Sequence, residues 1–422
     1  MTFDMKLVLV RLLIACQNLI LRVMRFLMFK SENLKEPDSI LVLRVSRLGD
    51  FINSIPALVS LRSRFPKARI TLLTTVSSHL QWEKVTGEYI KTGTPPPWVA
   101  FVYPSLVDAV EYFSLANRRE TIKQLKNYIS SANPDLTFIF PYSVEGLLGR
   151  AKKLAFLRLA GLRSRIYGIR VTSDARFMRQ TQYQNGMFKH QVWGPVDALR
   201  ECPLMPEIKE QDITFQFTIE PEAKAWAAKL WRDQGWAGSP VVALFPGGYW
   251  PHKRWLATEF AKLANTLSGE MDIQLVIIGA NIDREVCDEL AQSLQVPFLN
   301  LAGQTNLMQL AALMARCSLF VGNDSGPAHL AGAVDCPAVT LFSGIEYPGF
   351  WEPWNSRRYA LRHKVPCEPC FSFMKCPEGT LACIKGIDSD RVLRACCQAI
   401  KPQRVPSKKN WPQLSKNTRK VF

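Results

Sequence analysis

The chain has 422 residues, of which 47% are apolar and 21% charged, and its formal net charge is +17. This length exceeds what one hydrophobic core normally supports, so we expect two domains, and the apolar content excludes a disordered chain. Residues 401–422 hold seven basic side chains and no acid, and residues 1–30 hold five basic side chains and one acid. Because the sequence has no zinc-finger, homeodomain or RNP-type signature, these basic ends favour an anionic membrane surface over nucleic acid as partner.

The N-terminal arm, residues 1–36, is strongly apolar from residue 5 to residue 29. Four polar side chains fall on one helical stripe, namely Arg11, Asn18, Arg22 and Arg25. The longest run without charge, residues 12–21, is too short to span a bilayer. We therefore expect an amphipathic helix lying in the membrane interface. Two alternatives are a helix docked on the protein's own surface and a cleaved signal peptide, although Arg11 splits the apolar region that a signal peptide needs.

The region 37–205 alternates apolar β-branched runs with helical patterns. Residues 40–46 read as a buried parallel strand, followed by a turn at 47–50 and a helix that begins at 51. This alternation predicts a doubly wound domain, with a polar, irregular linker over 172–212. The remaining predicted strands of this domain are 69–74, 98–103, 136–140 and 165–169, and its other helices are 117–129 and 144–160.

The same alternation restarts in residues 213–400. Together the two halves predict an α/β fold of two doubly wound, Rossmann-like domains facing across a cleft, with ligands at the carboxyl ends of the strands. The tail 401–422 has three prolines and no helical period, so we expect it to be disordered. The predicted strands of the second half are 241–245, 273–279, 298–301, 318–321 and 338–342, and its helices are 222–234, 256–267, 283–294, 306–315 and one beginning at Pro327.

A Gly/Asn/Asp/Ser turn joins the strand 318–321 to the helix that begins at Pro327. Proline suits the first turn of a helix, and the free N–H groups and dipole of a helix N-terminus attract anions. Asp324 lies in this turn and His329 one turn into the helix, so both would flank a bound anion. The alternative is an ordinary turn in which Asp or Ser caps the helix.

A second turn, residues 246–253, contains Gly247 and Gly248, which let the backbone approach a ligand, and Lys253, a cation suited to phosphate. Two anion-binding edges on one sheet suit a diphosphate. From the first domain, Asp50 at the mouth of the first strand could take a proton from a hydroxyl across the cleft. The alternative role for Asp50 is that of a helix N-cap.

Three stretches resemble the signature motifs of glycosyltransferase family 9, the lipopolysaccharide heptosyltransferases that use ADP-heptose. They are Ser46-Arg-Leu-Gly-Asp-Phe-Ile-Asn-Ser-Ile-Pro-Ala-Leu58, Pro246-Gly-Gly-Tyr-Trp-Pro-His-Lys-Arg-Trp255 and Gly322-Asn-Asp-Ser-Gly-Pro-Ala-His-Leu330. The resemblance runs in register from about residue 40 to about residue 400. It implies two Rossmann-like domains of the GT-B type and an inverting reaction that needs neither a metal nor an organic cofactor.

The resemblance also implies roles for individual residues. Asp50 would be the general base, and Lys253 would contact the donor diphosphate. The loop 279–283 resembles the one that meets the ribose, with Asp283 as its carboxylate. Family members often have a small hydroxylated residue where this chain has Gly248 and Tyr249. The residues expected beside the donor sugar and its phosphates are Asp324, Ser325, Gly326 and His329.

The resemblance thus predicts transfer of heptose, or a related sugar, from a nucleoside-diphosphate sugar to a lipid-linked oligosaccharide, the inner core of lipopolysaccharide. The enzyme would be cytoplasmic and peripheral on the inner face of the bacterial inner membrane. Alternatives are a family member with another donor or acceptor, a sugar-nucleotide 2-epimerase-like enzyme, and a membrane-bound sugar-binding protein without turnover.

Two C-terminal features have open interpretations. Trp351 and Trp354 could shape the rim of the cleft or belong to the core. Four cysteines at these spacings could hold a structural zinc or serve as reduced packing residues. The four cysteines are Cys367, Cys370, Cys376 and Cys383.

Overall fold

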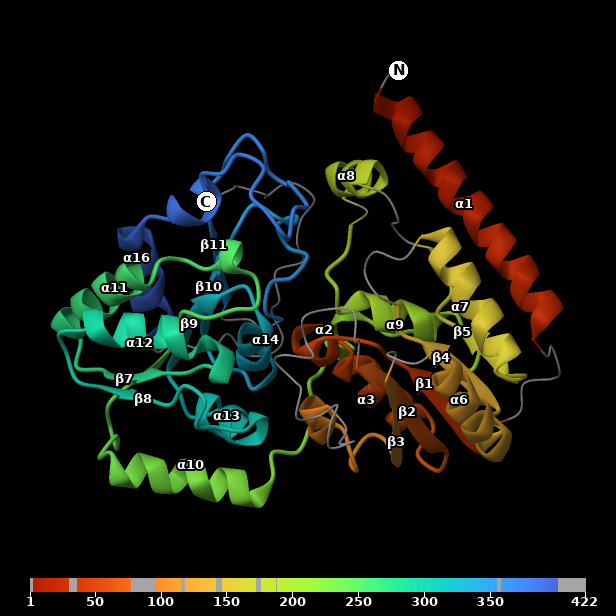
Figure 1. Cartoon of the computed structure of the whole chain (residues 1–422), viewed down its shortest axis with the longest axis horizontal. Coiled ribbons are helices and arrows are strands. Elements are labelled where there is room, and N and C mark those ends of the chain that lie inside the picture. The colour runs from red at the N-terminus through yellow and green to blue at the C-terminus, as the bar shows by residue number, and fades with distance from the viewer. Residues whose placement is uncertain are drawn as a thin grey trace.

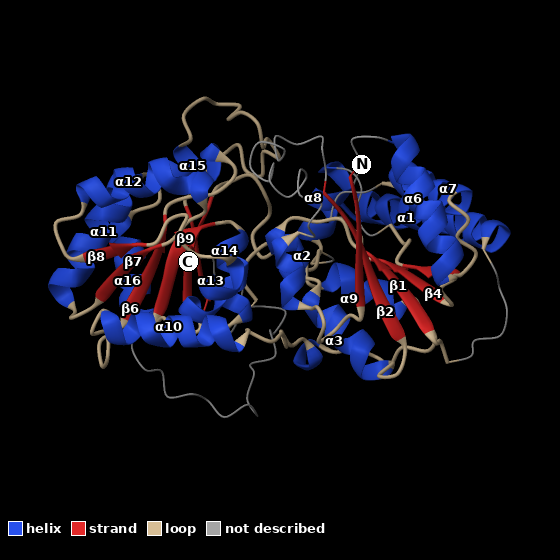
Figure 2. Cartoon of the chain, turned by 60° about the horizontal axis from the view of Figure 1, so that its bottom comes forward, coloured by secondary structure: helices blue, strands red, loops and turns tan. Residues whose placement is uncertain are grey.

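The computed structural model describes residues 3–29, 36–76, 96–114, 118–141, 146–171, 176–186, 188–354 and 358–400. These residues form two lobes, each a parallel sheet with helices on both faces (Figures 1 and 2). The predicted α/β architecture of two doubly wound units is therefore confirmed. The tail 401–422, for which we expect disorder, lies outside the described residues.

The N-terminal lobe is built on a five-stranded sheet in the order β3-β2-β1-β4-β5. All four neighbouring pairs are parallel, so every strand ends at the same edge of the sheet. The strands are β1 (Ser39–Leu43), β2 (Arg69–Val76), β3 (Ala109–Ser114), β4 (Leu136–Ile139) and β5 (Arg165–Tyr167). The helices are α2 (Leu48–Ile52), α3 (Ile55–Arg64), α6 (Arg118–Ala132), α7 (Leu147–Leu159), α8 (Arg176–Gln184) and α9 (Trp193–Arg200).

The C-terminal lobe has a six-stranded parallel sheet in the order β11-β10-β9-β6-β7-β8. Its strands are β6 (Val241–Phe245), β7 (Gln274–Ile277), β8 (Phe298–Asn300), β9 (Leu319–Asn323), β10 (Ala338–Phe342) and β11 (Arg358–Arg362). Its helices are α10 (Pro221–Asp233), α11 (Ala257–Glu270), α12 (Arg284–Ser293), α13 (Leu307–Met314), α14 (Gly326–Ala333), α15 (Ala382–Lys385) and α16 (Ser389–Ile400).

Three sequence-based expectations about these elements are wrong. The apolar run expected as strand 98–103 forms a short 3-10 helix, η1 (Pro97–Phe101), and the strand of this region is β3. A short buried apolar run fits either state, and here the prolines before it favour the helix. The expected irregular linker contains α8 and α9, and the expected final strand is followed by β11, whose charged ends hide its period.

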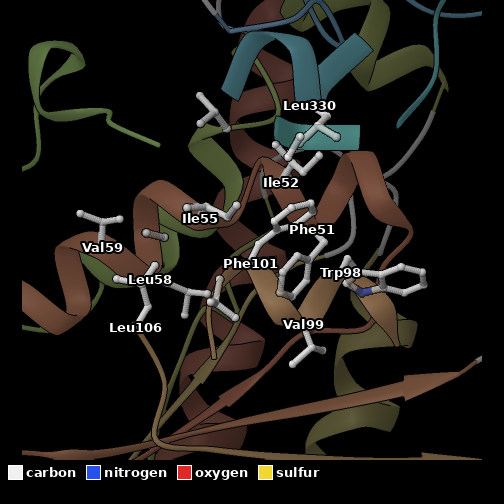
Figure 3. Close-up of a cluster of buried hydrophobic side chains, with 14 of the residues drawn as sticks. Phe51, Ile52, Ile55, Leu58, Val59, Trp98, Val99, Phe101, Leu106 and Leu330 are labelled. Atoms are coloured by element: carbon white, nitrogen blue, oxygen red, sulfur yellow. The ribbon is translucent and has the colours of Figure 1, made fainter. Parts of the chain in front are cut away.

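The two lobes share one continuous apolar core. Phe51 and Ile52 of α2 are buried beside Leu330 of α14, and η1 contributes Trp98 and Phe101 to the same cluster (Figure 3). Helix α2 packs on α14, and η1 packs on α13, so both contacts join one lobe to the other. The lobes therefore hold each other in a defined orientation, which positions the strand ends of both sheets.

The N-terminal arm forms α1 (Phe3–Met28), which packs against α7 and α8 along the side of the N-terminal lobe (Figure 1). Contrary to our expectation, this single helix is long and apolar enough, by length and composition alone, to cross a membrane. The sequence-based expectation considered only the uncharged run 12–21, whereas the helix extends on both sides of this run through Arg11, Arg22 and Arg25. Of the alternatives, the docked helix is the one that the structure shows.

Two residues of the polar stripe of α1, Asn18 and Arg25, contact the N-terminal lobe. The side chain of Asn18 donates to the Val171 carbonyl at 3.2 Å and accepts from the Val171 N–H at 2.7 Å. Arg25 donates to the Ile166 carbonyl at 3.5 Å. The apolar face consequently points outward, and Leu19, Phe26 and Leu27 are among its most exposed side chains.

Candidate active site

The candidate site lies where the strand order of each sheet reverses. In the N-terminal lobe the reversal falls between β1 and β4, and in the C-terminal lobe between β6 and β9. Ligands of doubly wound sheets bind at the carboxyl ends of strands at such points. Asp50 follows β1, Lys253 follows β6 and Asp324 follows β9, so the three predicted residues occupy the favoured positions of both sheets.

Asp50 is buried in the first turn of α2. Its Oδ1 atom lies 3.8 Å from Arg44 Nη2 and makes no hydrogen bond within the described residues. Arg44 Nη2 donates instead to the main-chain carbonyl of Asp50 at 2.7 Å, and Arg44 Nη1 to the Pro141 carbonyl at 2.6 Å. Arg47, not Asp50, occupies the N-cap position of α2, which disfavours the capping alternative for this carboxylate.

Burial raises the pKa of Asp50, and the positive charges of Arg44, Arg47 and Lys253 act against this rise. Desolvation destabilises a carboxylate, so the ionised group becomes a stronger base than an exposed aspartate. The influence of Lys253 also shows that the two lobes bring this carboxylate and this ammonium group into one electrostatic environment. The sequence gives no direct signal for Arg44, because a basic residue at the end of a strand is common.

Two glycines allow α2 and α14 to approach closely. A Cβ atom on Gly49 would lie 2.6 Å from Cδ2 of His329, and one on Gly326 would lie 2.8 Å from Cδ2 of Leu48. His329 is therefore packed against the residue before Asp50, which brings the turn of the second lobe next to α2 of the first. Burial lowers the pKa of His329 to about 4, so its ring is neutral near pH 7.

Lys253 and Asp324 form a partly buried ion pair with 2.5 Å between Nζ and Oδ2. The side chain of Asn323, which our sequence analysis did not single out, orients the turn that leads to Lys253. It donates to the carbonyls of Pro246 and Gly247 at 2.8 and 2.9 Å, and accepts from the Trp255 N–H at 3.0 Å. In the sequence, the only indication of this role for Asn323 was its position between Gly322 of the strand and Asp324 of the turn.

Asp283 holds the loop after β6 against the loop after β7. Its two carboxylate oxygens accept from the backbone N–H groups of Gly248 and Ala280, both at 3.0 Å. A Cβ on Gly247 would collide with this carboxylate, so the glycine is needed for the contact. The structure thus gives Asp283 a loop-positioning role, and its contact with a nucleotide ribose stays a prediction. Gly248 has φ +138°, a conformation that favours glycine.

An aromatic pair stands where family members often carry a small hydroxylated residue. The guanidinium carbon of Arg47 lies 4.4 Å from the ring centre of Tyr249 and 5.2 Å from that of Trp250. This contact between lobes puts the N-cap of α2 on the loop that carries Lys253. The sequence showed both partners but could not pair them, because they are about 200 residues apart.

The remaining predicted residues have mixed outcomes. Ser325 is the N-cap residue of α14, but its hydroxyl donates to the Asn323 carbonyl at 3.1 Å instead of capping the helix. Trp354 packs against Trp193 and His190 of the N-terminal lobe, and Trp351 lies beside His329. Within the described residues no group of three or more His, Cys, Asp or Glu side chains could hold one metal ion. The four C-terminal cysteines therefore do not form the metal site that their spacing allowed.

Comparison with known proteins identifies the family of this chain. A sequence profile of glycosyltransferase family 9 (heptosyltransferase) matches residues 152–381. Lipooligosaccharide heptosyltransferase 2 of Campylobacter jejuni serotype O:2 is 30% identical over 169 residues, which are 39% of this chain and 52% of that protein. The chain thus spans about half the length of this curated relative.

Two solved structures are similar over nearly the whole described fold. A family 9 glycosyl transferase from Veillonella parvula has a TM-score of 0.64 at 19% identity, covering 88% of this chain and 99% of its own. The ADP-heptose lps heptosyltransferase II of E. coli has a TM-score of 0.56 at 21% identity, covering 86% of this chain and 98% of its own. At these identities the likeness concerns the fold.

Proposed function

The chain belongs to glycosyltransferase family 9, and on this premise we propose that it transfers a heptose or a related sugar from a nucleoside-diphosphate sugar to the inner core of lipopolysaccharide. The proposed donor is ADP-heptose, and the proposed reaction inverts the anomeric configuration. The observation that carries this proposal is the arrangement of Asp50 from one lobe opposite the Lys253–Asp324 pair of the other.

In the proposed mechanism Asp50 accepts the proton of the attacking hydroxyl. Its burial makes the carboxylate more basic, and its free Oδ1 atom makes no competing hydrogen bond within the described residues. The hydroxyl oxygen then bonds to the anomeric carbon, while the bond from that carbon to the diphosphate oxygen breaks. Attack from the side opposite the diphosphate gives inversion.

The leaving diphosphate gains negative charge as its bond to the sugar breaks. Lys253 supplies a cation, and the N-terminus of α14 supplies free backbone N–H groups directed at the same end of the sheet. In the structure Asp324 holds Lys253 at 2.5 Å, so the lysine is positioned before the donor arrives. A preorganised cation stabilises the transition state without a reorganisation cost.

We further propose that the enzyme is cytoplasmic and lies on the inner face of the inner membrane. The apolar side of α1 points away from the protein, while basic residues Lys6, Arg11 and Arg22 are exposed along the same helix. Apolar side chains with basic neighbours suit an anionic bilayer surface. A lipid-linked acceptor would then reach the site without leaving the membrane.

Replacing Leu19, Phe26 and Leu27 by serine tests the membrane proposal, because their exposed fractions are 62, 70 and 74% and their removal leaves the docked face of α1 intact. We expect binding to vesicles with anionic lipid to fall about tenfold or more, since each side chain loses about 1 kcal/mol or more of burial. Serine at Phe298, exposed on the distant edge strand β8, is the matched control. Unchanged vesicle binding by the triple variant would refute the proposal.

The proposed reaction is tested by incubating purified protein with ADP-heptose and delipidated inner-core oligosaccharide. We expect one new glycosidic linkage of inverted configuration by NMR, with release of one ADP per linkage. Conversion of the donor to an epimer without acceptor would instead identify the epimerase-like alternative. Donor binding without any product would identify the sugar-binding alternative.

A further inference from the structure

A cluster of partly buried charged groups that the proposed mechanism does not use lies beside the Lys253–Asp324 pair. It consists of Arg179 from α8, Glu346 from the loop after β10, and Arg362 at the end of β11. Arg179 belongs to the N-terminal lobe, and the other two residues belong to the C-terminal lobe. The charges of Lys253 and Asp324 both act on Glu346, which places the cluster next to the candidate active site.

The hydrogen bonds of this cluster are incomplete within the described residues. Glu346 Oε2 lies 3.6 Å from Arg179 Nη1 and has no hydrogen-bond donor. The Nε and Nη1 atoms of Arg179 and the Nε and Nη2 atoms of Arg362 are likewise buried without an acceptor. A buried guanidinium N–H without an acceptor is costly, so its retention in a folded protein calls for a functional explanation.

Neighbouring contacts hold the cluster in place. The guanidinium of Arg179 lies 4.3 Å from the ring centre of Phe371, and Tyr183, one turn further along α8, stacks on Tyr347 at 4.7 Å. Arg362 Nη1 donates to the carbonyls of Ser343 and Glu346 at 3.0 and 3.4 Å, which leaves its other N–H groups directed elsewhere. Both arginines are therefore fixed at their stems while part of each guanidinium remains without an acceptor.

The cluster lies at the opposite side of the C-terminal sheet from the loop that Asp283 holds. In the strand order β11-β10-β9-β6-β7-β8, Arg362 ends β11, and the loop held by Asp283 follows β7. These two strands lie on opposite sides of the β9–β6 reversal point. In the donor pose that we propose, the nucleotide lies toward β7 and the sugar toward β9 and β10, which leaves the β11 side to the other substrate.

We propose that Arg179 and Arg362 form an anion subsite for the acceptor, which binds a phosphate or carboxylate group near the attacking hydroxyl. Guanidinium groups pair with such oxyanions through two parallel hydrogen bonds, which fixes orientation as well as position. The inference rests on the proposed function and adds the residues that select an anionic acceptor. Because the two arginines come from different lobes, a bound anion would also join the lobes.

Glu346 acts as the counter-ion of these arginines before the acceptor binds. Burial raises the pKa of Glu346 to about 7, while Arg179 and Lys253 act against this rise. Its carboxylate is therefore easily protonated near neutral pH, and an arriving oxyanion can replace it beside the arginines. After this exchange the two guanidinium groups pair with the substrate oxyanion instead of with Glu346.

The test measures binding to the full-length protein by calorimetry, using Arg179→Gln, Arg362→Gln and the exposed control Arg232→Gln on α10. The probes are delipidated inner-core oligosaccharide, the same oligosaccharide after removal of phosphate and esterification of its carboxylates, and ADP. We expect the first two variants to bind the anionic oligosaccharide on the order of 10- to 100-fold more weakly. Binding of ADP should change by less than about twofold, because the subsite is separate from the nucleotide.

The wild type and both variants should have the same affinity for the neutralised oligosaccharide, because it lacks the anionic groups that the arginines would bind. The subsite is refuted if the variants weaken binding of the anionic and neutralised forms by the same factor, or if they weaken ADP as much as oligosaccharide. Arg179→Lys keeps the charge and the packing stem, so it should lose less affinity than Arg179→Gln. If wild type binds the oligosaccharide through these arginines but transfers no sugar, the proposed function fails and the subsite stands.

Discussion

Alanine at Gly326 should force the two lobes apart at the junction of α2 and α14. The added Cβ would lie 2.8 Å from Cδ2 of Leu48 and 3.1 Å from Cβ of Leu48. Carbon atoms in unstrained contact are about 3.5–4.0 Å apart, so the closest overlap is at least about 0.7 Å. Rotation of the leucine side chain relieves only the first contact, because its Cβ is attached to the backbone of α2.

The energetic effect follows from two opposing terms. Overpacking of this kind costs about 1–3 kcal/mol, whereas alanine in place of glycine in a helix returns about 0.5–1 kcal/mol. We therefore expect the free energy of unfolding to fall by as much as about 2.5 kcal/mol, with about 1 kcal/mol at the centre of the range. Asp50 is two residues from Leu48, so a shift of α2 also moves the proposed base, and kcat/KM should fall on the order of 10- to 100-fold.

Urea unfolding and steady-state kinetics measure the two effects. Gly269→Ala in α11 is the matched control, because no described atom lies within 4 Å of its added Cβ and the substitution should be neutral or stabilising. Leu48→Ala removes the contacts with Cδ2 and Cγ and keeps only the one with Cβ, so Gly326→Ala should cost less in that background. Additivity of the two substitutions within about 0.5 kcal/mol, with unchanged kcat/KM for Gly326→Ala, would refute the close-approach reasoning.

Three further predictions concern the chemistry itself. Asp50→Asn should leave ADP binding unchanged while transfer falls by roughly 10²–10⁴-fold, and wild-type turnover would show that this carboxylate is not the base. Lys253→Ala should weaken donor binding and lower kcat together, because a diphosphate contact strengthens as charge develops, whereas intact calorimetry and kinetics would show that the lysine serves only Asp324. Arg44→Gln should move the acid limb of the kcat/KM profile to higher pH, because this arginine opposes the rise in the pKa of Asp50, and an unmoved limb would contradict the assignment.

Local sequence patterns were sufficient to locate the turns at the carboxyl ends of the strands that carry the proposed site residues. Short β-branched runs bounded by glycine, proline or polar residues form strands wherever both faces are buried, and each residue after such a run lies at the strand's carboxyl end. Asp50, Lys253 and Asp324 were found in this way, and the doubly wound architecture followed from the same alternation. These features depend on neighbours within a few residues, which a single sequence displays.

Only the tertiary structure decided which groups meet. The Lys253–Asp324 pair, the Asp283 loop contact and the stacking of Arg47 on Tyr249 each join residues from separate strand ends or lobes. Sequence spacing carries no record of those distances, because loop length hardly restricts where two strand ends come together. The Arg179–Glu346 contact was hidden for the same reason, since α8 lay in a stretch that looked like a linker.

The orientation of α1 is another property that the local sequence pattern left open and the tertiary contacts decided. Its sequence determined a long helix with one polar stripe, and amphipathicity alone would place that stripe in water. The structure instead gives the stripe hydrogen-bond partners at Val171 and Ile166, which are main-chain groups beside an edge strand. The docked side of α1 also buries Leu21, together with Phe29 just after the helix, so apolar packing together with these hydrogen bonds decided which side of the helix faces the protein.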